Sequence, residues 1–372
     1  MKRVCVIGGG LAGLVCALSA AARGMNVKLF DANPKRGASL THHVVIEPST
    51  MRDLAALGIG DDCVREGFAF HGIHVLDRQG RLSQDLPTMR ITGIRYPAAI
   101  GITVGRLSAI VAAAAKARGA QLLLDESVLA ITQSGDHAVT LTLSSGGQEQ
   151  ADLVVLACGP TSWLRAELFP EAQAVINLGQ AWSCTKIQRP NGMDRPVIAI
   201  GGAGRKAILV PVSHDATVVT LVEPSIQNLP ETPTAAYLRK SLARFAPAVR
   251  DLAPYVDDDS LVSRLPARSG LLAPPWHNGR VIAVGECAHT LPPHLGQGAA
   301  QAIEDAIVLG DLIDKQGASP SLARRFTERR FERVDRVHHV LRDAYQWYLD
   351  PEGDTDLKDA SLKVAQIVGN IP

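Results

Sequence analysis

Apolar residues along the chain fall into two patterns. Short, uninterrupted apolar runs at 3–7, 27–30, 153–157 and 281–284 are typical of parallel strands that are buried on both faces. An alanine- and leucine-rich segment at 11–22, followed by a glycine, predicts a helix between the first two runs. A strand, a helix and a second strand in this order predict a βαβ unit and a doubly wound α/β domain with a Rossmann-like fold.

The pattern changes in the middle of the chain, where β-rich stretches follow one another with turns and no long helix between them. These stretches lie at 182–187, 197–200, 207–212 and 217–222. Such an order predicts an antiparallel sheet that interrupts the Rossmann-like domain. A hairpin around Gln79-Gly80 is predicted to join this sheet.

Further segments complete the expected secondary structure. Helices are predicted at 49–57 with Ser49 as N-cap, 108–118, 235–245, 298–312 and 321–348, and strands at 121–124 and 139–143. We expect one discontinuous domain of residues 1–70, 100–175 and 270–345, a β-sheet domain of 71–99 and 176–269, and a C-terminal tail of 346–372 without a clear pattern.

Composition narrows the class of protein. Of the 372 residues, 46% are hydrophobic and 20% are charged, which is an ordinary globular balance, and the net charge of +1 favours neither a nucleic-acid partner nor an anionic membrane surface. No apolar run reaches the ~18 residues of a membrane span. The six cysteines form no C-x-x-C pair and lie mostly in apolar runs, so we expect free thiols, no metal site and a cytoplasmic location.

A glycine motif, Gly8-x-Gly10-x-x-Gly13, lies between the first predicted strand and helix. Gly8 permits a tight turn, Gly10 lets a pyrophosphate approach the backbone, and Gly13 lets the helix pack close to the strand. The N-terminus of the helix favours phosphate charge. Asp31 closes the second strand, where its carboxylate is able to accept the adenosine ribose hydroxyls. The segment predicts a dinucleotide and leaves FAD and NAD open.

A second motif favours FAD over NAD as the dinucleotide. After the buried run at 281–284, the chain reads Gly285-Glu286-Cys287-Ala288-His289, then Pro292-Pro293, Gly296-Gln297-Gly298 and a helix that carries Glu304-Asp305. A strand that ends in a carboxylate is followed by a proline-stiffened, glycine-rich turn that opens a helix. Such a turn lets backbone approach a flat ligand, and the helix N-terminus favours the negative charge of a reduced flavin.

With these motifs, residues 1–345 resemble the group A flavoprotein monooxygenases, the single-component FAD-dependent aromatic hydroxylases related to para-hydroxybenzoate hydroxylase. Arg106 matches an arginine of that family that contacts FAD. The motifs and the resemblance together give the following FAD-binding residues: Gly8, Gly10, Leu11, Ala12, Gly13, Asp31, Ala32, Arg106, Val128, Gly159, Glu286, Pro293, Gly296, Gln297, Gly298 and Ala299.

The chain departs from the family pattern at three positions. Glu286 occupies the position where the family has an aspartate that holds a ribitol hydroxyl, and Cys287 occupies the position of an alanine. We therefore expect Cys287 to be a packing residue. Cys158 replaces the aspartate of an Ala-Asp-Gly-x-x-Ser-x-x-Arg motif that the family uses for flavin and NAD(P)H binding, although Gly159, Ser162 and Arg165 remain. FAD binding is expected to persist, while the use of NAD(P)H as the electron donor becomes an open question.

The resemblance implies hydroxylation of a small aromatic or heteroaromatic substrate by dioxygen through a flavin C4a-hydroperoxide, with NAD(P)H or a separate flavin reductase as the source of electrons. His42 and His43 are candidates for the base that deprotonates the substrate, and Pro293 is expected to border the flavin. Alternatives are a flavoprotein of the same fold that does not hydroxylate and a pure binding protein. We expect a monomer or homodimer.

Overall fold

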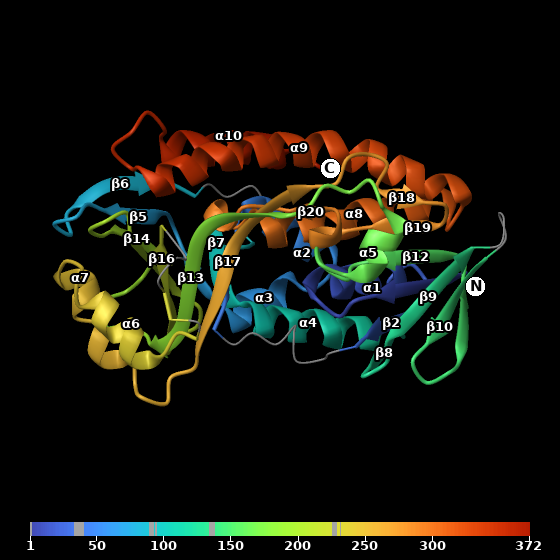
Figure 1. Cartoon of the computed structure of the whole chain (residues 1–372), viewed down its shortest axis with the longest axis horizontal. Coiled ribbons are helices and arrows are strands. Elements are labelled where there is room, and N and C mark those ends of the chain that lie inside the picture. The colour runs from blue at the N-terminus through green and yellow to red at the C-terminus, as the bar shows by residue number, and fades with distance from the viewer. Residues whose placement is uncertain are drawn as a thin grey trace.

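A parallel sheet forms the centre of one half of the molecule (Figure 1). The computed structural model describes residues 2–32, 41–88, 93, 95–133, 138–224, 229–230 and 232–372. The strand order is β18 (His277–Asn278), β19 (Val281–Ala283), β12 (Leu153–Leu156), β1 (Arg3–Ile7), β2 (Asn26–Asp31) and β8 (Gln121–Leu124). All neighbours are parallel except β18 and β19. The predicted Rossmann-like arrangement is confirmed.

Helices and a small sheet surround these strands. Helix α1 (Leu11–Ala21) packs against both α4 (Val104–Ala117) and α8 (Gln297–Gln316). The antiparallel strands β9 (Val128–Gln133), β10 (Val139–Leu143) and β11 (Gln148–Ala151) connect β8 to β12. The short helix α5 (Trp163–Leu168) follows β12. The largest hydrophobic cluster joins buried residues of the parallel sheet to these helices, so the ends of β1 and β2 are held rigidly.

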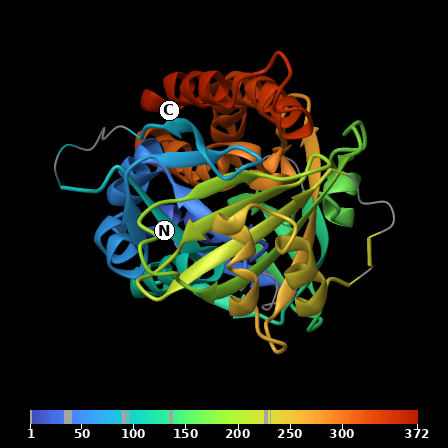
Figure 2. The ribbon, with the colours of Figure 1, turned by 90° about the vertical axis from the view of Figure 1, so that its left-hand side faces the viewer.

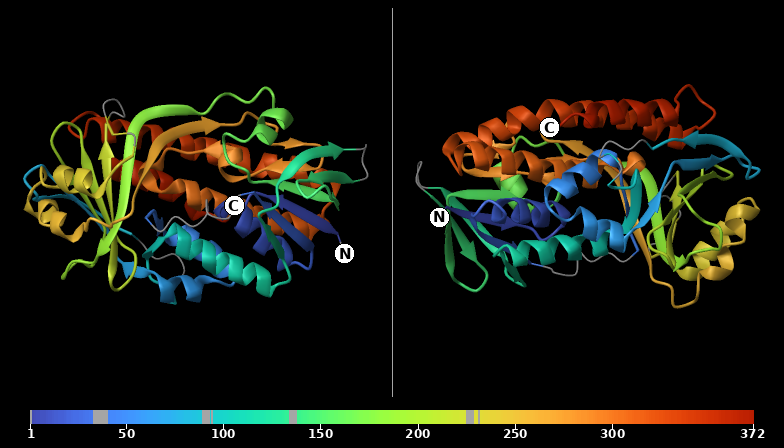
Figure 3. Two further views of the ribbon diagram at one scale, coloured as in Figure 1. Left: turned by 60° about the horizontal axis from the view of Figure 1, so that its bottom comes forward. Right: turned by 180° about the vertical axis from the view of Figure 1, so that it is seen from behind.

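The predicted antiparallel sheet is also confirmed. Its order is β20 (His289–Thr290), β17 (Val262–Leu271), β13 (Ile176–Gln188), β16 (Ala216–Glu223), β15 (Lys206–Pro211), β14 (Val197–Ile200), β5 (Ile73–Leu76) and β6 (Leu82–Leu86). Only the pair of β5 with β14 is parallel. Helices α6 (Ala235–Leu242) and α7 (Pro247–Arg250), with the 3-10 turn η1 (Ala253–Tyr255), lie in front of it in Figure 2. Strands β13 and β17 run side by side toward the parallel sheet (Figure 3).

A further three-stranded sheet lies where the two halves meet. Strand β7 (Ala99–Thr103) pairs with β3 (His43–Ile46) on one side and with β4 (Phe68–Phe70) on the other. Helices α2 (Pro48–Ala56) and α3 (Gly60–Glu66) follow β3 along the chain, and α2 contacts α8. This sheet therefore brings the segment around His43 next to the start of α8.

Two long C-terminal helices extend across both halves (Figure 1). Helix α9 (Pro320–Leu349) is followed by α10 (Leu357–Gly369), which packs on it. The expected tail without a pattern is thus wrong for 357–369. Its apolar residues recur at helical spacing and are buried: Leu357, Ala360, Val364, Ile367 and Val368. The intervening lysines and polar residues hide this narrow apolar stripe in the sequence.

Three predicted boundaries need correction. Helix α2 starts at Pro48 with Glu47 as N-cap, so Ser49 is not the cap, because proline fits the first helical position. Helix α4 starts at Val104, four residues before the predicted start, and the Thr103 hydroxyl accepts a hydrogen bond from the backbone N–H of Arg106 at 3.2 Å. Strand β13 is longer than predicted, because its first residues pair with β17.

Candidate cofactor site and active site

The glycine turn between β1 and α1 is closely packed beneath and open above. Gly8 has a φ of +112°, and a Cβ on it would lie 2.3 Å from the carbonyl oxygen of Ala157. A Cβ on Gly13 would lie 1.9 Å from the carbonyl oxygen of Gly8, so any side chain there would separate α1 from β1. These two glycines are needed for the turn itself.

Gly10 has a different environment from its neighbours. It is the N-cap of α1 with φ −68° and ψ 174°, a conformation open to any residue, and a Cβ on it would meet no atom of the described residues within 4 Å. Gly10 has no side chain to cap the first turn of α1, which begins with Leu11 and Ala12. Open space in front of uncapped backbone N–H groups fits a pyrophosphate.

Asp31 lies beside the same turn. It is the last residue of β2, and its Oδ2 atom would be 2.4 Å from a Cβ on Gly9. The carboxylate and the glycine turn therefore form one surface, with the exposed Ala32 next along the chain. Val128 opens β9, and its side chain is buried in the core, which leaves only its backbone for a ligand.

The second motif folds into a compact turn. It comprises the 3-10 turn η2 (Gly285–Cys287), β20, the 3-10 turn η3 (Pro293–Leu295) and the N-terminus of α8. Among the described residues, no atom lies within 4 Å of a Cβ placed on Gly159, Gly296 or Gly298, so backbone is open to a ligand at these positions too. The half-buried Ala299 lies in the first turn of α8. The arrangement fits a flat ring system held by backbone.

Asp305 holds this turn in place from below. Its Oδ2 accepts hydrogen bonds at 2.8 Å from the backbone N–H of Gly285 and from Nε2 of His289, while its Oδ1 accepts one at 2.7 Å from Nε of Arg330. The Asp305, His289 and Arg330 side chains are completely buried. Burial alone would raise the pKa of Asp305, but His289 and Arg330 outweigh it and lower the pKa. His289 is therefore a structural part of the turn.

A chain of buried amides continues from this network to β3. Arg330 donates to Oε1 of Gln301 at 2.8 Å, Gln301 donates to Oε1 of Gln297 at 3.4 Å, and Gln297 donates to Oε2 of Glu47 at 3.0 Å. Burial raises the pKa of Glu47 to about 7, and the bond from Gln297 opposes this rise. Sequence reasoning missed Glu47, because a single glutamate before a proline carries no motif.

The two charged residues predicted near FAD differ in environment. Arg106 is exposed and donates from Nε to Oε2 of Glu66 at 2.8 Å, an ion pair that the sequence did not predict. The Glu286 side chain reaches solvent, yet it is surrounded closely enough by protein that desolvation raises its pKa, against the nearby charges of His289 and Arg268.

The predicted catalytic residues lie on two sides of the junction between the sheets. His42 is half-buried, and its Nε2 is 3.1 Å from Oγ of Ser263 on β17. His43 opens β3, and its Nδ1 atom is buried with no hydrogen-bond partner among the residues that the structure describes. Burial, helped by His42, lowers the pKa of His43 to about 4. Pro293 is half-buried at the start of η3.

Three further residues in or beside the antiparallel sheet have separate partners. Trp182 stacks on Tyr348 of α9 with ring centroids 5.9 Å apart. Cys184 is buried with its Sγ 3.3 Å from Oγ1 of Thr220. Arg205 lies 3.6 Å from Glu223. Trp182 is thus the one that connects this sheet to α9.

The two cysteines that depart from the family pattern lie together. Cys158 follows β12 and Cys287 ends η2, and their Sγ atoms are 3.8 Å apart. Arg165 of α5 donates from Nε to the carbonyl oxygen of Cys287 at 2.8 Å. Cys287 is fully buried, in keeping with the expected packing role, whereas Cys158 is partly accessible.

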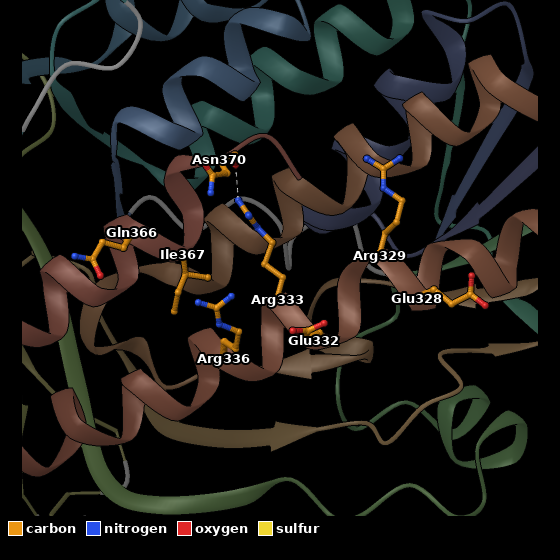
Figure 4. Close-up of a pocket in the computed structure, with 8 residues that line it drawn as sticks. All are labelled: Glu328, Arg329, Glu332, Arg333, Arg336, Gln366, Ile367 and Asn370. Carbon is orange, nitrogen blue, oxygen red and sulfur yellow. Dashed lines mark hydrogen bonds between the residues drawn. The ribbon is translucent and has the colours of Figure 1, made fainter.

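A separate surface hollow of about 250 Å³ lies between α9 and α10 (Figure 4). It is lined mostly by charged and polar side chains, among them Arg329, Arg333 and Glu332. Arg333 donates to the carbonyl oxygen of Asn370 across it at 2.7 Å. None of the predicted FAD-binding or catalytic residues lines this hollow.

Comparisons with known proteins agree with this geometry. Residues 1–339 match the family model described as FAD binding domain. The chain is 28% identical over 385 residues to the 3-amino-4-hydroxybenzoate 2-monooxygenase of Streptomyces platensis, covering 98% of this chain and 93% of that one. It is 26% identical over 359 residues to the 6-hydroxynicotinate 3-monooxygenase of Bordetella bronchiseptica, covering 92% and 91%.

Solved structures share the fold. Klebsiella pneumoniae HpxO, complexed with FAD and uric acid, superimposes with a TM-score of 0.82 at 20% identity and covers 99% of this chain and 93% of that one. The family match extends from the glycine turn to α9 and includes both open cradles. The chain therefore belongs to the FAD binding domain family, in the group of FAD-dependent aromatic monooxygenases that its motifs resemble.

Proposed function

We propose that this protein is an FAD-dependent monooxygenase that hydroxylates a small aromatic or heteroaromatic compound. The observation that carries the proposal is the presence of two open backbone cradles, at Gly10 and at Gly298, within one family match. Bound FAD would supply the activation of dioxygen, which no amino-acid side chain provides. The names of the relatives support an electron-rich ring with hydroxyl, amino or carboxyl groups.

The residues that would hold FAD follow from the positions of the cradles. Gly8, Gly10, Leu11, Ala12 and Gly13 would bind the pyrophosphate, with Asp31 and Ala32 at the adenosine. Around the flavin half we propose Arg106, Val128, Gly159, Glu286, Pro293, Gly296, Gln297, Gly298 and Ala299. The backbone open space at Gly159, Gly296 and Gly298 supports this assignment.

We propose His42 rather than His43 as the base that deprotonates the substrate. His42 is partly accessible, and its contact with Ser263 on β17 links it to the antiparallel sheet. Burial lowers the pKa of His42, so the ring is neutral at pH 7 and able to accept a proton. Burial lowers the pKa of His43 to about 4, which makes it a weaker base.

The electron donor is the second part of the proposal. Cys158 lies beside the glycine turn, since its Cα would be 3.1 Å from a Cβ on Gly8. A neutral or thiolate sulfur there lacks the hydrogen-bonding geometry of a carboxylate. We propose that either NAD(P)H binds in a different manner from the family pattern or a separate flavin reductase supplies the electrons. The second candidate function is that of a flavoprotein that does not hydroxylate, and it is also favoured by the presence of Cys158 in place of the family's aspartate.

Three further proposals concern the domain boundaries, the location and the oligomeric state of the protein. The FAD-binding domain would comprise residues 1–70, 100–175 and 270–345. The substrate domain would comprise 71–99 and 176–269, and a C-terminal segment would comprise 346–372.

No helix within the described ranges is long and apolar enough to cross a membrane. We also propose a cytoplasmic location, because the six cysteines form no disulfide among the described residues, and a monomer or homodimer.

A single experiment tests the function. Purified protein is examined for the absorbance of bound flavin and is then mixed in air with NADH, NADPH or a flavin reductase, with hydroxynicotinate, aminohydroxybenzoate and urate as trial substrates. Oxidation of the donor that rises with substrate and yields a hydroxylated product is expected. Protein without flavin would refute the proposal, and flavin that is reduced without any hydroxylated product would favour the second candidate.

A further inference from the structure

Two cysteines from distant parts of the chain meet beneath the cofactor site. Cys158 and Cys287 are 129 residues apart in sequence, and their sulfurs are 3.8 Å apart. A disulfide needs a separation of about 2 Å, so its formation requires the two side chains to rotate toward each other. The other four cysteines, Cys5, Cys16, Cys63 and Cys184, have no such sulfur contact among the described residues.

We propose that Cys158 and Cys287 form a dithiol site that hydrogen peroxide converts to a disulfide. This inference does not depend on the reaction at the flavin. It goes beyond the expected packing role of Cys287 and gives a joint role to two positions that depart from the family pattern.

The surroundings assign different tasks to the two sulfurs. Cys158 is partly accessible, so peroxide is able to reach it, whereas Cys287 is fully buried. A hydrogen bond from Cys287 lowers the pKa of Cys158, with help from Ser162 and from the charge of Arg165. The same contact and burial raise the pKa of Cys287. Cys158 is therefore the thiolate that attacks, and Cys287 is the thiol that resolves.

The chemistry balances in two steps. The Cys158 thiolate attacks one oxygen of hydrogen peroxide, the O–O bond breaks, and a sulfenic acid and hydroxide result. The Cys287 sulfur then attacks the Cys158 sulfur, the S–O bond breaks, and the proton of Cys287 leaves with that oxygen as water. The two thiols lose two electrons, which reduce one peroxide to two waters.

The location gives the disulfide a structural consequence. Cys158 adjoins Gly8 at the end of β12, and Cys287 ends the turn whose Gly285 packs on Ala12 of α1. A bond between them would join the two segments that frame the glycine turn. Arg165 already joins α5 to this turn through the carbonyl oxygen of Cys287, so the disulfide would add a covalent link at a place that is already close-packed.

The test counts thiols in the purified, FAD-containing protein. The protein is treated with hydrogen peroxide, unfolded, alkylated and mapped by mass spectrometry without a reductant. Of the six cysteines, two are expected to disappear as free thiols, with a linked peptide pair that contains Cys158 and Cys287. Dithiothreitol should restore all six. Six free thiols, or peroxide products at other cysteines with Cys158 and Cys287 unchanged, would overturn the proposal.

Single variants separate the two roles. Cys287→Ala should leave Cys158 as a sulfenic acid that a 1,3-dione reagent labels, and Cys158→Ser should leave all five remaining thiols free at the same peroxide dose. Cys63→Ala is the matched control, since it removes a buried cysteine elsewhere and should keep the loss of two thiols. Dione labelling of Cys287 in the Cys158→Ser protein, with no labelling of Cys158 in the Cys287→Ala protein, would reverse the assignment and contradict it. Because the wild-type peptide map decides alone, a variant that fails to fold leaves the test intact.

Discussion

The side-chain amide of Gln297 donates a hydrogen bond of 3.0 Å to the carboxylate of Glu47, which lies 250 residues earlier in the chain. Gln297 opens α8 beside the open backbone of Gly298, and Glu47 is the N-cap of α2. The contact connects the proposed flavin-binding turn to the strand that carries His43. The position of β3 is therefore coupled to the turn that would hold the ring system of FAD.

Glu47 should make stability depend on pH. Its pKa is raised from 4.5 to about 7 by burial, so the folded protein binds a proton more tightly than the unfolded chain does. The protonated Glu47 side chain therefore makes its full contribution to the free energy of unfolding below pH 4.5, and this contribution is lost as the pH rises through 7. The full effect is about 3 kcal/mol.

The measurement compares Glu47→Gln with the wild type by denaturant unfolding between pH 4.5 and 8. Glutamine keeps a hydrogen-bonding partner for Gln297 without a charge, so the variant should gain stability relative to the wild type as the pH rises. Glu328→Gln, at an exposed ion pair on α9, is the control and should show no such trend. A constant difference between Glu47→Gln and the wild type would contradict the raised pKa.

Gly10→Val should produce a folded protein that does not retain FAD. The backbone of Gly10 is open to any residue and the space in front of it is empty, so a valine costs the fold little while its side chain fills the proposed path of the pyrophosphate. We expect FAD affinity to fall by at least about 100-fold, since several charge-assisted hydrogen bonds would be lost. Flavin absorbance after gel filtration, together with circular dichroism, measures both properties.

Gly13→Val is the matched comparison within the same turn. Its Cβ would overlap the carbonyl oxygen of Gly8, so this variant should lose stability as well as FAD. If Gly10→Val retained a normal flavin content, the pyrophosphate could not pass in front of Gly10.

Asp305→Asn should destabilise the fold by about 3 kcal/mol, because it removes one of the two carboxylate charges, those of Glu304 and Asp305, that compensate the buried Arg330. The backbone N–H of Gly285 and the ring of His289 would also lose a charged acceptor. Thermal unfolding of the protein measures the loss. Asp314→Asn breaks an exposed ion pair with Arg23 and should change stability by less than about 1 kcal/mol. Similar values for the two variants would show that the buried network is not tightly coupled.

Much of the fold was predictable because its signals are local. The runs at 3–7 and 281–284 are buried on both faces and carry few polar residues, and the glycine spacing of 8, 10 and 13 follows from one turn. Contacts between distant segments have no such signal. The bond between Glu47 and Gln297 and the approach of Cys158 to Cys287 both depend on how β3, β12 and α8 come together. The stripe of α10 was missed because lysines and polar residues lie between its apolar positions.

His42→Gln should slow hydroxylation far more than it weakens binding. If the neutral ring of His42 accepts the proton of the substrate, its loss lowers kcat by roughly 100-fold, a common magnitude for a general base. The difference in kcat between the wild type and His42→Gln should become smaller as the pH approaches the pKa of the substrate, because a substrate that is already ionised needs no base. His43→Gln is the matched variant, with its ring buried and its pKa near 4, and it should not show this rescue. Steady-state product formation across pH 6 to 9 distinguishes the two. A His42→Gln enzyme whose deficit stays constant over that range would show that His42 positions the chain through Ser263 and takes no proton.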